Sequence, residues 1–134
     1  MQPFLALPIT SYVVILQAPL PTLTNAPVTE VALFWLPTNA NQAQISSFKS
    51  AFASLAAAVK QAEGEVYLAS GDVQGLVLNS SGERTSAVLA YVGWQSVAAH
   101  GAFTTTTSFI DAIARLSPTV SGLADHHVIL SKCF

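Results

Sequence analysis

The pattern of hydrophobic and polar positions after residue 27 predicts a strand, a helix, a hairpin, a second helical region and a last strand. Residues 28–36 (VTEVALFWL) carry apolar side chains on both faces, which is typical of a strand covered on both sides. Glu30 is the charged exception in this stretch, and Pro37 ends it. We therefore expect a buried strand with a carboxylate on one of its apolar faces.

An amphipathic helix is predicted over residues 42–62. Its apolar residues recur at alternating spacings of three and four and form one stripe: Ile45, Phe48, Phe52, Leu55 and Val59. Asn41 and Gln44 have the spacing of a capping box at the helix start. Gly64 supplies a residue that tolerates the left-handed conformation just after its end.

The next stretch predicts a β-hairpin. Residues 65–69 and 73–79 are interpreted as one strand with a bend or bulge at residues 70–72. Residues 80–83 form the expected turn, and residues 85–92 form the returning strand.

Two short helical pieces and a strand complete the chain. Ser96 is expected to cap a helix that runs to Phe103, and a second piece ends before Pro118. Residues 125–133 are predicted as the last strand, centred on residues 128–130. The resulting order, β-α-β-β-α-β, predicts an α+β ferredoxin-like domain at residues 28–134 with a four-stranded antiparallel sheet. Helices would cover one face of that sheet, and a second sheet stacked on the other face would bury it.

Residues 1–27 form an apolar, proline-rich extension that carries no charge. Five of the seven prolines lie there, and residues 12–16 (YVVIL) predict a short strand between them. The stretch lacks the basic residues of a signal peptide and is too interrupted for a membrane span, so no membrane contact is expected. We expect an extra edge strand, or an arm that covers another subunit.

Charge is scarce in the 134-residue chain. Charged residues make up 9%, hydrophobic residues 51%, and the net charge is −2. This composition argues against disorder and against nucleic-acid binding. A single cysteine, Cys133, excludes a disulfide scaffold and suits a reducing cytoplasm. So few charges favour a homodimer that buries apolar surface, although a monomer with a Ser/Thr/Asn/Gln-rich surface is the alternative.

His100 and Glu30 are the first candidates for chemistry. An imidazole beside a pocket exchanges protons near neutral pH, but His100 can equally bond backbone carbonyls at a helix end. Burial of Glu30 would raise its pKa into a useful range, but the carboxylate can instead reach solvent at the sheet end.

His126 and His127 are neighbours on the last predicted strand, so their side chains should point to opposite faces. One of them is expected to face the pocket, and His127 is the candidate for a catalytic role. Adjacent strand residues cannot converge on one ion, and no other metal-ligand spacing is present, so no metal is expected. No nucleotide-binding motif is present either, and no cofactor is expected.

Six aromatic residues are candidates for lining a substrate cavity, with ordinary core packing as the alternative for each. They are Trp94, Tyr91, Tyr67, Trp35, Phe52 and Phe103. Tyr91 and Trp94 should lie on opposite faces of their strand, so both cannot line one pocket without a local twist.

Residues 91–103 (YVGWQSVAAHGAF) resemble a segment of the dimeric α+β barrel superfamily. They are similar to its antibiotic-biosynthesis-monooxygenase-like and stress-responsive A/B barrel branches of the fungal type. There a strand ends in Gly-Trp, a Ser opens a short helix, and a His followed by Phe comes one to two turns later. The resemblance covers residues 28–134 and implies two protomers that pack their sheets into a barrel, with one pocket each. The superfamily contains many activities, so membership fixes the fold better than the reaction.

These observations together predict a cofactor-independent enzyme for a hydrophobic aromatic or polyketide-type substrate in secondary metabolism. Proton-transfer chemistry of the cyclase, dehydratase or isomerase type is favoured, with His100 exchanging the proton and Glu30 or His127 as second group. A cofactor-free monooxygenase and a non-catalytic stress-responsive or binding protein are the alternatives. An enclosed apolar cavity of ~300 Å³ or more beside His100 or Glu30 would favour the enzyme, and a plugged core the binding protein.

Overall fold

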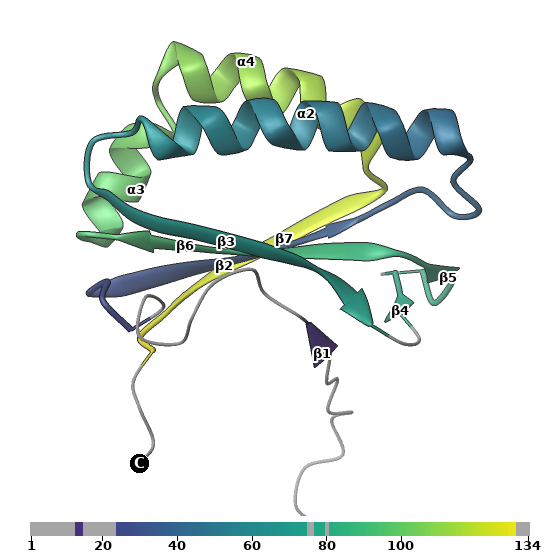
Figure 1. Cartoon of the computed structure of the whole chain (residues 1–134), viewed down its shortest axis with the longest axis horizontal. Coiled ribbons are helices and arrows are strands. Elements are labelled where there is room, and N and C mark those ends of the chain that lie inside the picture. The colour runs from purple at the N-terminus through teal and green to yellow at the C-terminus, as the bar shows by residue number, and fades with distance from the viewer. Residues whose placement is uncertain (1–12, 15–23, 75–76, 80, 131–134) are drawn as a thin grey trace, which may run out of the picture.

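An antiparallel sheet carries all the helices on one of its faces (Figure 1). The computed structural model describes residues 13–14, 24–74, 77–79 and 81–130. The order of the sheet is β1-β3-β6-β2-β7. Its strands are β1 (Val13–Val14), β2 (Val28–Trp35), β3 (Glu65–Gln74), β6 (Ala87–Trp94) and β7 (Gly122–Val128). The order β3-β6-β2-β7 is that of the ferredoxin-like fold, which confirms the predicted fold class.

Helix α2 (Gln42–Lys60) confirms the predicted amphipathic helix and its cap. The Asn41 side chain accepts a hydrogen bond from the Gln44 backbone N–H, and the Gln44 side chain accepts one from the Asn41 backbone N–H, both at 2.8 Å. Gly64 has a φ of +87°, and a Cβ there would approach Ala99 to 2.6 Å. Glycine is therefore required at Gly64 for conformation and for space.

The remaining helices follow β6 (Figure 1). They are α3 (Val97–Phe103), α4 (Thr107–Leu116) and the 3₁₀ turn η1 (Ser117–Thr119). Helix α4 packs beside α2 above the sheet, and α3 lies at one end of it. The predicted cap of α3 is confirmed: the Ser96 hydroxyl accepts a hydrogen bond from the Ala99 backbone N–H at 3.0 Å.

The hydrophobic core lies between the helices and the sheet. Its largest buried side chains are Phe34, Phe48, Trp94, Phe103 and Leu116. A smaller cluster on the opposite face contains Tyr67, Ala69 and Ala26. On that face the hydroxyls of Thr29 and Tyr67 lie 2.8 Å apart and form a buried hydrogen bond.

The predicted bend at residues 70–72 is wrong. Strand β3 runs through this stretch in register with β6, with Gly71 opposite Leu89. The irregularity lies instead between Glu65 and Tyr67. Unbroken pairing with β6 supplies hydrogen-bond partners to the whole stretch, which overrides the local preference of a Ser-Gly-Asp sequence for a turn. The hairpin ends in a separate pair, β4 (Val77–Leu78) with β5 (Arg84–Thr85).

The predicted bounds of the last strand are also wrong. Strand β7 begins at Gly122 and ends at Val128, so of the apolar residues 128–130 the first is the last residue of the strand and the other two follow it. Pairing with β2 sets these limits, because Trp35 lies opposite Gly122 and Thr29 opposite Val128.

The N-terminal strand predicted at residues 12–16 is present as β1, with Val14 paired to Val73 at the edge of the sheet. The other predicted residues of that strand lie outside the described residues. Within the part of the chain that is described, no helix combines the length and the apolar character needed to cross a bilayer.

Candidate active site

Strand register brings three ionisable side chains to the helix-covered face of the sheet. Glu30 on β2 lies opposite His127 on β7, and Ala32 lies opposite Asp125. Side chains alternate along a strand, and paired residues share a face. Glu30, His127 and Asp125 therefore all face the layer between the sheet and the helices.

His100 enters this layer from helix α3. Only two residues separate this helix from β6, and the second of them, Ser96, caps it. Its first turn places His100 over the end of the sheet. There its ring stacks on Trp94, with centroids 5.1 Å apart and planes 22° apart. Only 8% of His100 is exposed.

The polar atoms of these residues form a continuous chain. The Trp94 indole N–H donates to Glu30 Oε1 at 3.3 Å. Glu30 Oε2 lies 3.3 Å from His100 Nε2. His100 Nδ1 lies 2.7 Å from Nε2 of His127, which is exposed. A proton path thus runs from the buried carboxyl through the buried imidazole to an imidazole in contact with solvent.

Burial shifts the pKa of both central groups toward their neutral forms. Loss of solvent raises the pKa of Glu30 from 4.5 to about 7; the negative charge of Asp125 adds to this, and the Trp94 hydrogen bond opposes it. Burial, and then the neighbouring His127, lower the pKa of His100. Although the two side chains stand at ion-pair distance, just below pH 7 they are better described as a carboxyl beside a neutral imidazole than as an ion pair.

A neutral pair fixes the roles of donor and acceptor along the chain. Trp94 donates to Oε1 of Glu30, and the carboxyl proton on Oε2 faces the lone pair of His100 Nε2. His100 then carries its own proton on Nδ1 and donates it to Nε2 of His127. When Glu30 is ionised, the opposite set of tautomers satisfies the same contacts. The arrangement can therefore move one proton without moving a heavy atom far.

A mostly apolar cavity of about 110 Å³ lies beside Glu30 and His100. Strands β2, β3, β6 and β7 form its floor, and α2, α3 and α4 form its roof. Leu123 and Asp125 line it and are exposed, so it reaches the surface at β7. This cavity is smaller than the ~300 Å³ that would favour an enzyme, but the core is not plugged, as the binding protein would require. The volume alone therefore does not decide between the two functions.

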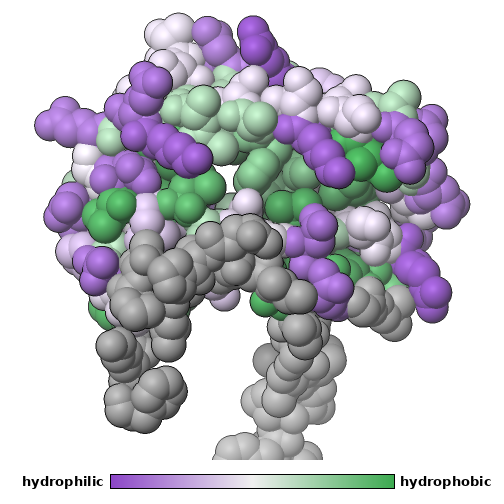
Figure 2. Space-filling model, viewed as in Figure 1, coloured by the Kyte–Doolittle hydropathy of each residue, from purple (hydrophilic) through white to green (hydrophobic). Residues whose placement is uncertain are grey.

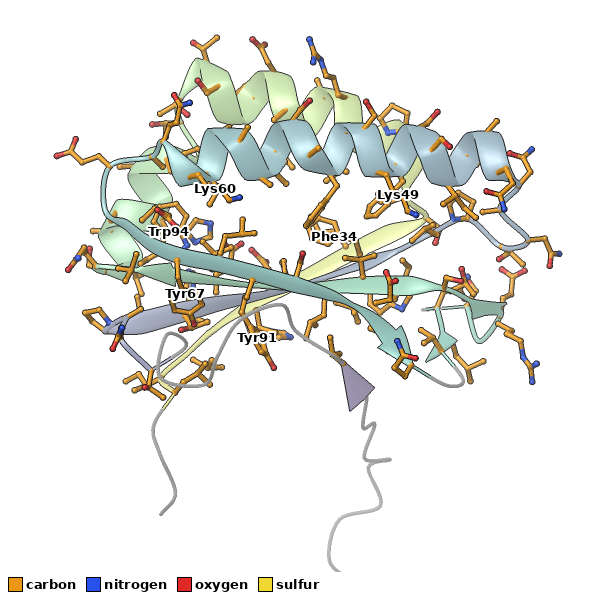
Figure 3. The ribbon with its side chains drawn as sticks, viewed as in Figure 1. Phe34, Lys49, Lys60, Tyr67, Tyr91 and Trp94 are labelled. Carbon is orange, nitrogen blue, oxygen red and sulfur yellow. The ribbon has the colours of Figure 1, made fainter. Side chains whose placement is uncertain are left out.

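Two of the six predicted aromatic lining residues, Phe52 and Phe103, do line this cavity. Trp94 is fully buried behind His100 and positions it by stacking. Tyr67 and Tyr91 point to the opposite face of the sheet (Figure 3), and strand alternation puts Trp35 on that face too, so the predicted place of these three residues in this cavity is wrong. The physical reason is strand alternation, because Tyr91 pairs with Val31, which neighbours Glu30 and points the other way.

The structure also places His126 and Asp125. His126 lies opposite Val31 on the far face, so His127 is the histidine of the pair that joins the site. Asp125 was missed by the sequence reasoning. Its only signal was its spacing of two residues from His127 on a strand, which puts both side chains on one face.

One set of ligand atoms in the described residues has the spacing of a metal site. Atoms of Glu30, His100 and Asp125 lie within 4.8 Å of one another. Two carboxylates and an imidazole could hold a divalent cation. Burial is the main cause of the raised pKa of Glu30, and the nearby Asp125 adds to it without any ion. The sequence-based expectation that no metal is used stays a prediction.

Solved structures share this fold. A dimeric protein of unknown function with a ferredoxin-like fold from Bacteroides fragilis is 17% identical, with a TM-score of 0.58 over 77% of this chain and 95% of that one. SnoaB, a cofactor-independent oxygenase from Streptomyces nogalater, is 18% identical, with a TM-score of 0.53 over 78% and 93% of the two chains. The hydroxynitrile lyase of Passiflora edulis is 14% identical, with a TM-score of 0.53 over 80% and 95%.

At these identities the likeness shows the fold alone. The chain has the ferredoxin-like fold that solved antibiotic-biosynthesis-monooxygenase-like proteins also have, which confirms the fold that the resemblance implies. No protein-family model and no curated protein matches the sequence. These neighbours include an oxygenase and a lyase, so the shared fold does not select one reaction.

Proposed function

We propose that this protein is a cofactor-independent enzyme that moves a proton on a hydrophobic, aromatic or polyketide-type substrate. The observation that carries the proposal is the continuous chain Glu30–His100–His127, which links an apolar cavity to solvent. Cyclisation, dehydration and isomerisation in secondary metabolism all require a proton to leave one atom of the substrate and return to another. A buried base whose pKa lies near 7 is suited to that task.

Glu30 is the group that takes the substrate's proton in this mechanism. Ionised Glu30 lines the cavity in surroundings that favour its neutral form, so proton uptake relieves the cost of a buried charge. In the tautomer of His100 that carries its proton on Nδ1, the proton then passes from Oε2 of Glu30 to Nε2 of His100, while the Nδ1 proton moves to Nε2 of His127. Exposed His127 exchanges it with water, or the path runs backwards to reprotonate the product.

Two other functions have some support. The solved oxygenase supports a cofactor-free monooxygenase, in which the same base would ionise the substrate before it reacts with oxygen. The cavity volume of about 110 Å³ supports a non-catalytic binding protein, because it is small for a fused aromatic substrate.

The base is tested with a small aromatic probe whose reaction needs only proton removal. In 5-nitrobenzisoxazole, loss of the ring C–H proton to a base breaks the N–O bond and releases a phenolate that is followed by its absorbance. The wild-type rate should rise with pH through about 7, as Glu30 becomes ionised. Removing a general base costs ~100-fold or more, so Glu30→Gln should lose that factor, and His100→Gln should lower the rate at least tenfold.

The matched control is His126→Gln, which changes a histidine on the opposite face and should leave the rate unchanged. If His100→Gln and His126→Gln react alike, His100 has no part in proton transfer. If the wild-type protein binds the probe, as measured by quenching of its tryptophan fluorescence, but reacts with it no faster than buffer does, the proposed enzyme is wrong and the binding protein is favoured.

A homodimer is part of the same proposal. The dimeric neighbours support it, and the sheet face opposite the helices presents half-buried Val31, Leu33 and Trp35. We propose that a second copy packs on this face and that the segment containing β1 adds to the contact. A cytoplasmic location likewise remains a proposal, based on the single cysteine.

A further inference from the structure

The cavity beside His100 is too small for the substrate class proposed above. At about 110 Å³ it is smaller than a cavity of ~150 Å³ that accommodates one benzene molecule. A fused aromatic substrate therefore requires further space that adjoins the cavity.

An open groove of about 710 Å³ supplies such space between α2 and the adjoining parts of β3 and β6. Figure 2 shows the hollow on this face, beneath α2, with hydrophobic side chains in its wall. Its lining combines apolar Phe48, Ala53 and Val88 with polar Ser70 and Gln74. One side of the groove thus suits an aromatic surface and the other offers hydrogen bonds.

Phe52 is the partition between the cavity and the groove. Phe34 lines the cavity, Phe48 lines the groove, and Phe52 lines both. The Phe52 ring stacks on Phe48 at 5.7 Å and meets Phe34 edge-on at 5.6 Å. It is only half-buried, and small residues follow it on α2: Ala53 lines the groove, and Ala56 lines the cavity. A rotamer change of this one ring would join the two spaces.

Lys49 is the one cationic residue among the described residues that line the groove. It stands one turn before Phe52, lines the groove and reaches from α2 toward the sheet (Figure 3). Among the described residues Lys49 forms no ion pair. Asp72 also lines the groove but is not within ion-pair distance of Lys49. The ammonium group is therefore available to an anionic group of a ligand.

We propose that the cavity and the groove form one elongated binding site that takes a flat aromatic acid, with Phe52 as its movable partition. The acidic group binds at Lys49, the ring system stacks against Phe48, and the reacting end enters the cavity beside Glu30 and His100. Which end reacts rests on the proposed function, whereas the binding site itself does not.

Two fluorescent probes test the site in the full-length protein. One is 8-anilinonaphthalene-1-sulfonate, an aromatic acid, and the other is its uncharged counterpart N-phenyl-1-naphthylamine. Lys49→Gln should weaken binding of the sulfonate about two- to fivefold, as expected for an exposed charge pair, and leave the uncharged probe unchanged. The matched control is Lys60→Gln on the same helix, outside the groove, which should change neither affinity.

A second pair of variants tests the place of binding. Ala53→Trp fills the groove from an exposed position of α2, and Ala57→Trp adds the same ring at an exposed position that does not line the groove. We expect Ala53→Trp to weaken both probes at least tenfold and Ala57→Trp to leave both unchanged. If Ala53→Trp lowers the melting temperature, Ala53→Leu serves as the milder filler. Phe52→Leu, which shrinks the partition, should strengthen binding several-fold.

Three results would overturn the inference. Equal effects of the two lysine variants would contradict binding of the acidic group at Lys49. Equal effects of the two tryptophan variants would contradict binding in the groove, and an unchanged affinity in Phe52→Leu would contradict the role of Phe52 as the partition. Failure of the proposed function is separate, because benzisoxazole turnover that does not depend on His100 leaves these binding results intact.

Discussion

The substitution Glu30→Gln should make the protein more stable at alkaline pH. The folded protein holds a proton on Glu30 up to about pH 7, whereas the ordinary value for the group is 4.5. Between these two values the folded state keeps a proton that the unfolded chain has released. Stability therefore falls as the pH rises through this window, and the loss is complete above it.

The magnitude follows from the size of the shift. A rise from 4.5 to about 7 corresponds to about 3 kcal/mol of stability lost on going from pH 4 to pH 8. Glutamine has nearly the same shape and cannot ionise. Its oxygen can accept from Trp94, and its amide can donate to Nε2 of His100 as the protonated carboxyl does.

Urea unfolding at matched ionic strength and protein concentration, followed by tryptophan fluorescence, measures the effect. At pH 4 the variant and the wild type should be equally stable, and at pH 8 the variant should be more stable by about 3 kcal/mol at most. The lowered pKa of His100 acts in the opposite direction in both proteins, and it makes the figure for Glu30 an upper value. The control Glu63→Gln, at an exposed residue, should change stability by less than about 0.5 kcal/mol at either pH.

The opposite sign would refute this reasoning. If Glu30 were ionised and paired with a charged His100, Glu30→Gln would lower stability at pH 8, because it would leave a buried charge without its partner. A difference that does not vary with pH would show that Glu30 does not titrate in this range.

Three further predictions concern the fold and the assembly. Gly93→Ala should lower the free energy of unfolding by about 2 kcal/mol or more in the urea assay, because the new Cβ would collide with the Tyr67 ring and approach Ala26 Cβ to 2.7 Å. The control is Gly101→Ala, which should be neutral or stabilising because nothing lies within 4 Å of its new Cβ. Asn41→Ala should cost about 1 kcal/mol through loss of the capping box, and an unchanged midpoint would contradict it. Light scattering at micromolar concentration should give the mass of a dimer, and deletion of residues 1–24 should lower the melting temperature; a 14.0 kDa particle whose truncated form melts like the full chain would contradict both.

Local patterns were sufficient where the physical cause is itself local. The stripe of apolar residues, the Asn41–Gln44 cap and the left-handed Gly64 all act within a few residues, and the structure confirms each. The bend predicted at residues 70–72 and the limits of the last strand were wrong because their cause is pairing with a distant strand. Sequence periodicity carries no information on which partner a strand will have.

The candidate site also combines features that have a local cause with features that depend on distant parts of the chain. His100, Glu30 and His127 could be chosen singly, from residue type and predicted burial. Their meeting depends on the β2–β7 register that sets Glu30 opposite His127, and on α3 folding back over Trp94. The far-face aromatic residues were misplaced because aromatic character does not say which face of a strand lines the cavity. Alternation does, once one residue of the cavity is known.

The variant Glu30→Gln can separate the contribution of this carboxyl to stability from its contribution to function. A carboxylate kept only for structure would be ionised and paired, and its removal would destabilise the fold. Here the surroundings favour the neutral acid, so above pH 7 the protein carries a charge that a glutamine would avoid. Residues that oppose the stability of their own fold are expected at functional sites. If Glu30→Gln is more stable at pH 8 and also loses benzisoxazole turnover, the carboxyl serves proton transfer and not the fold.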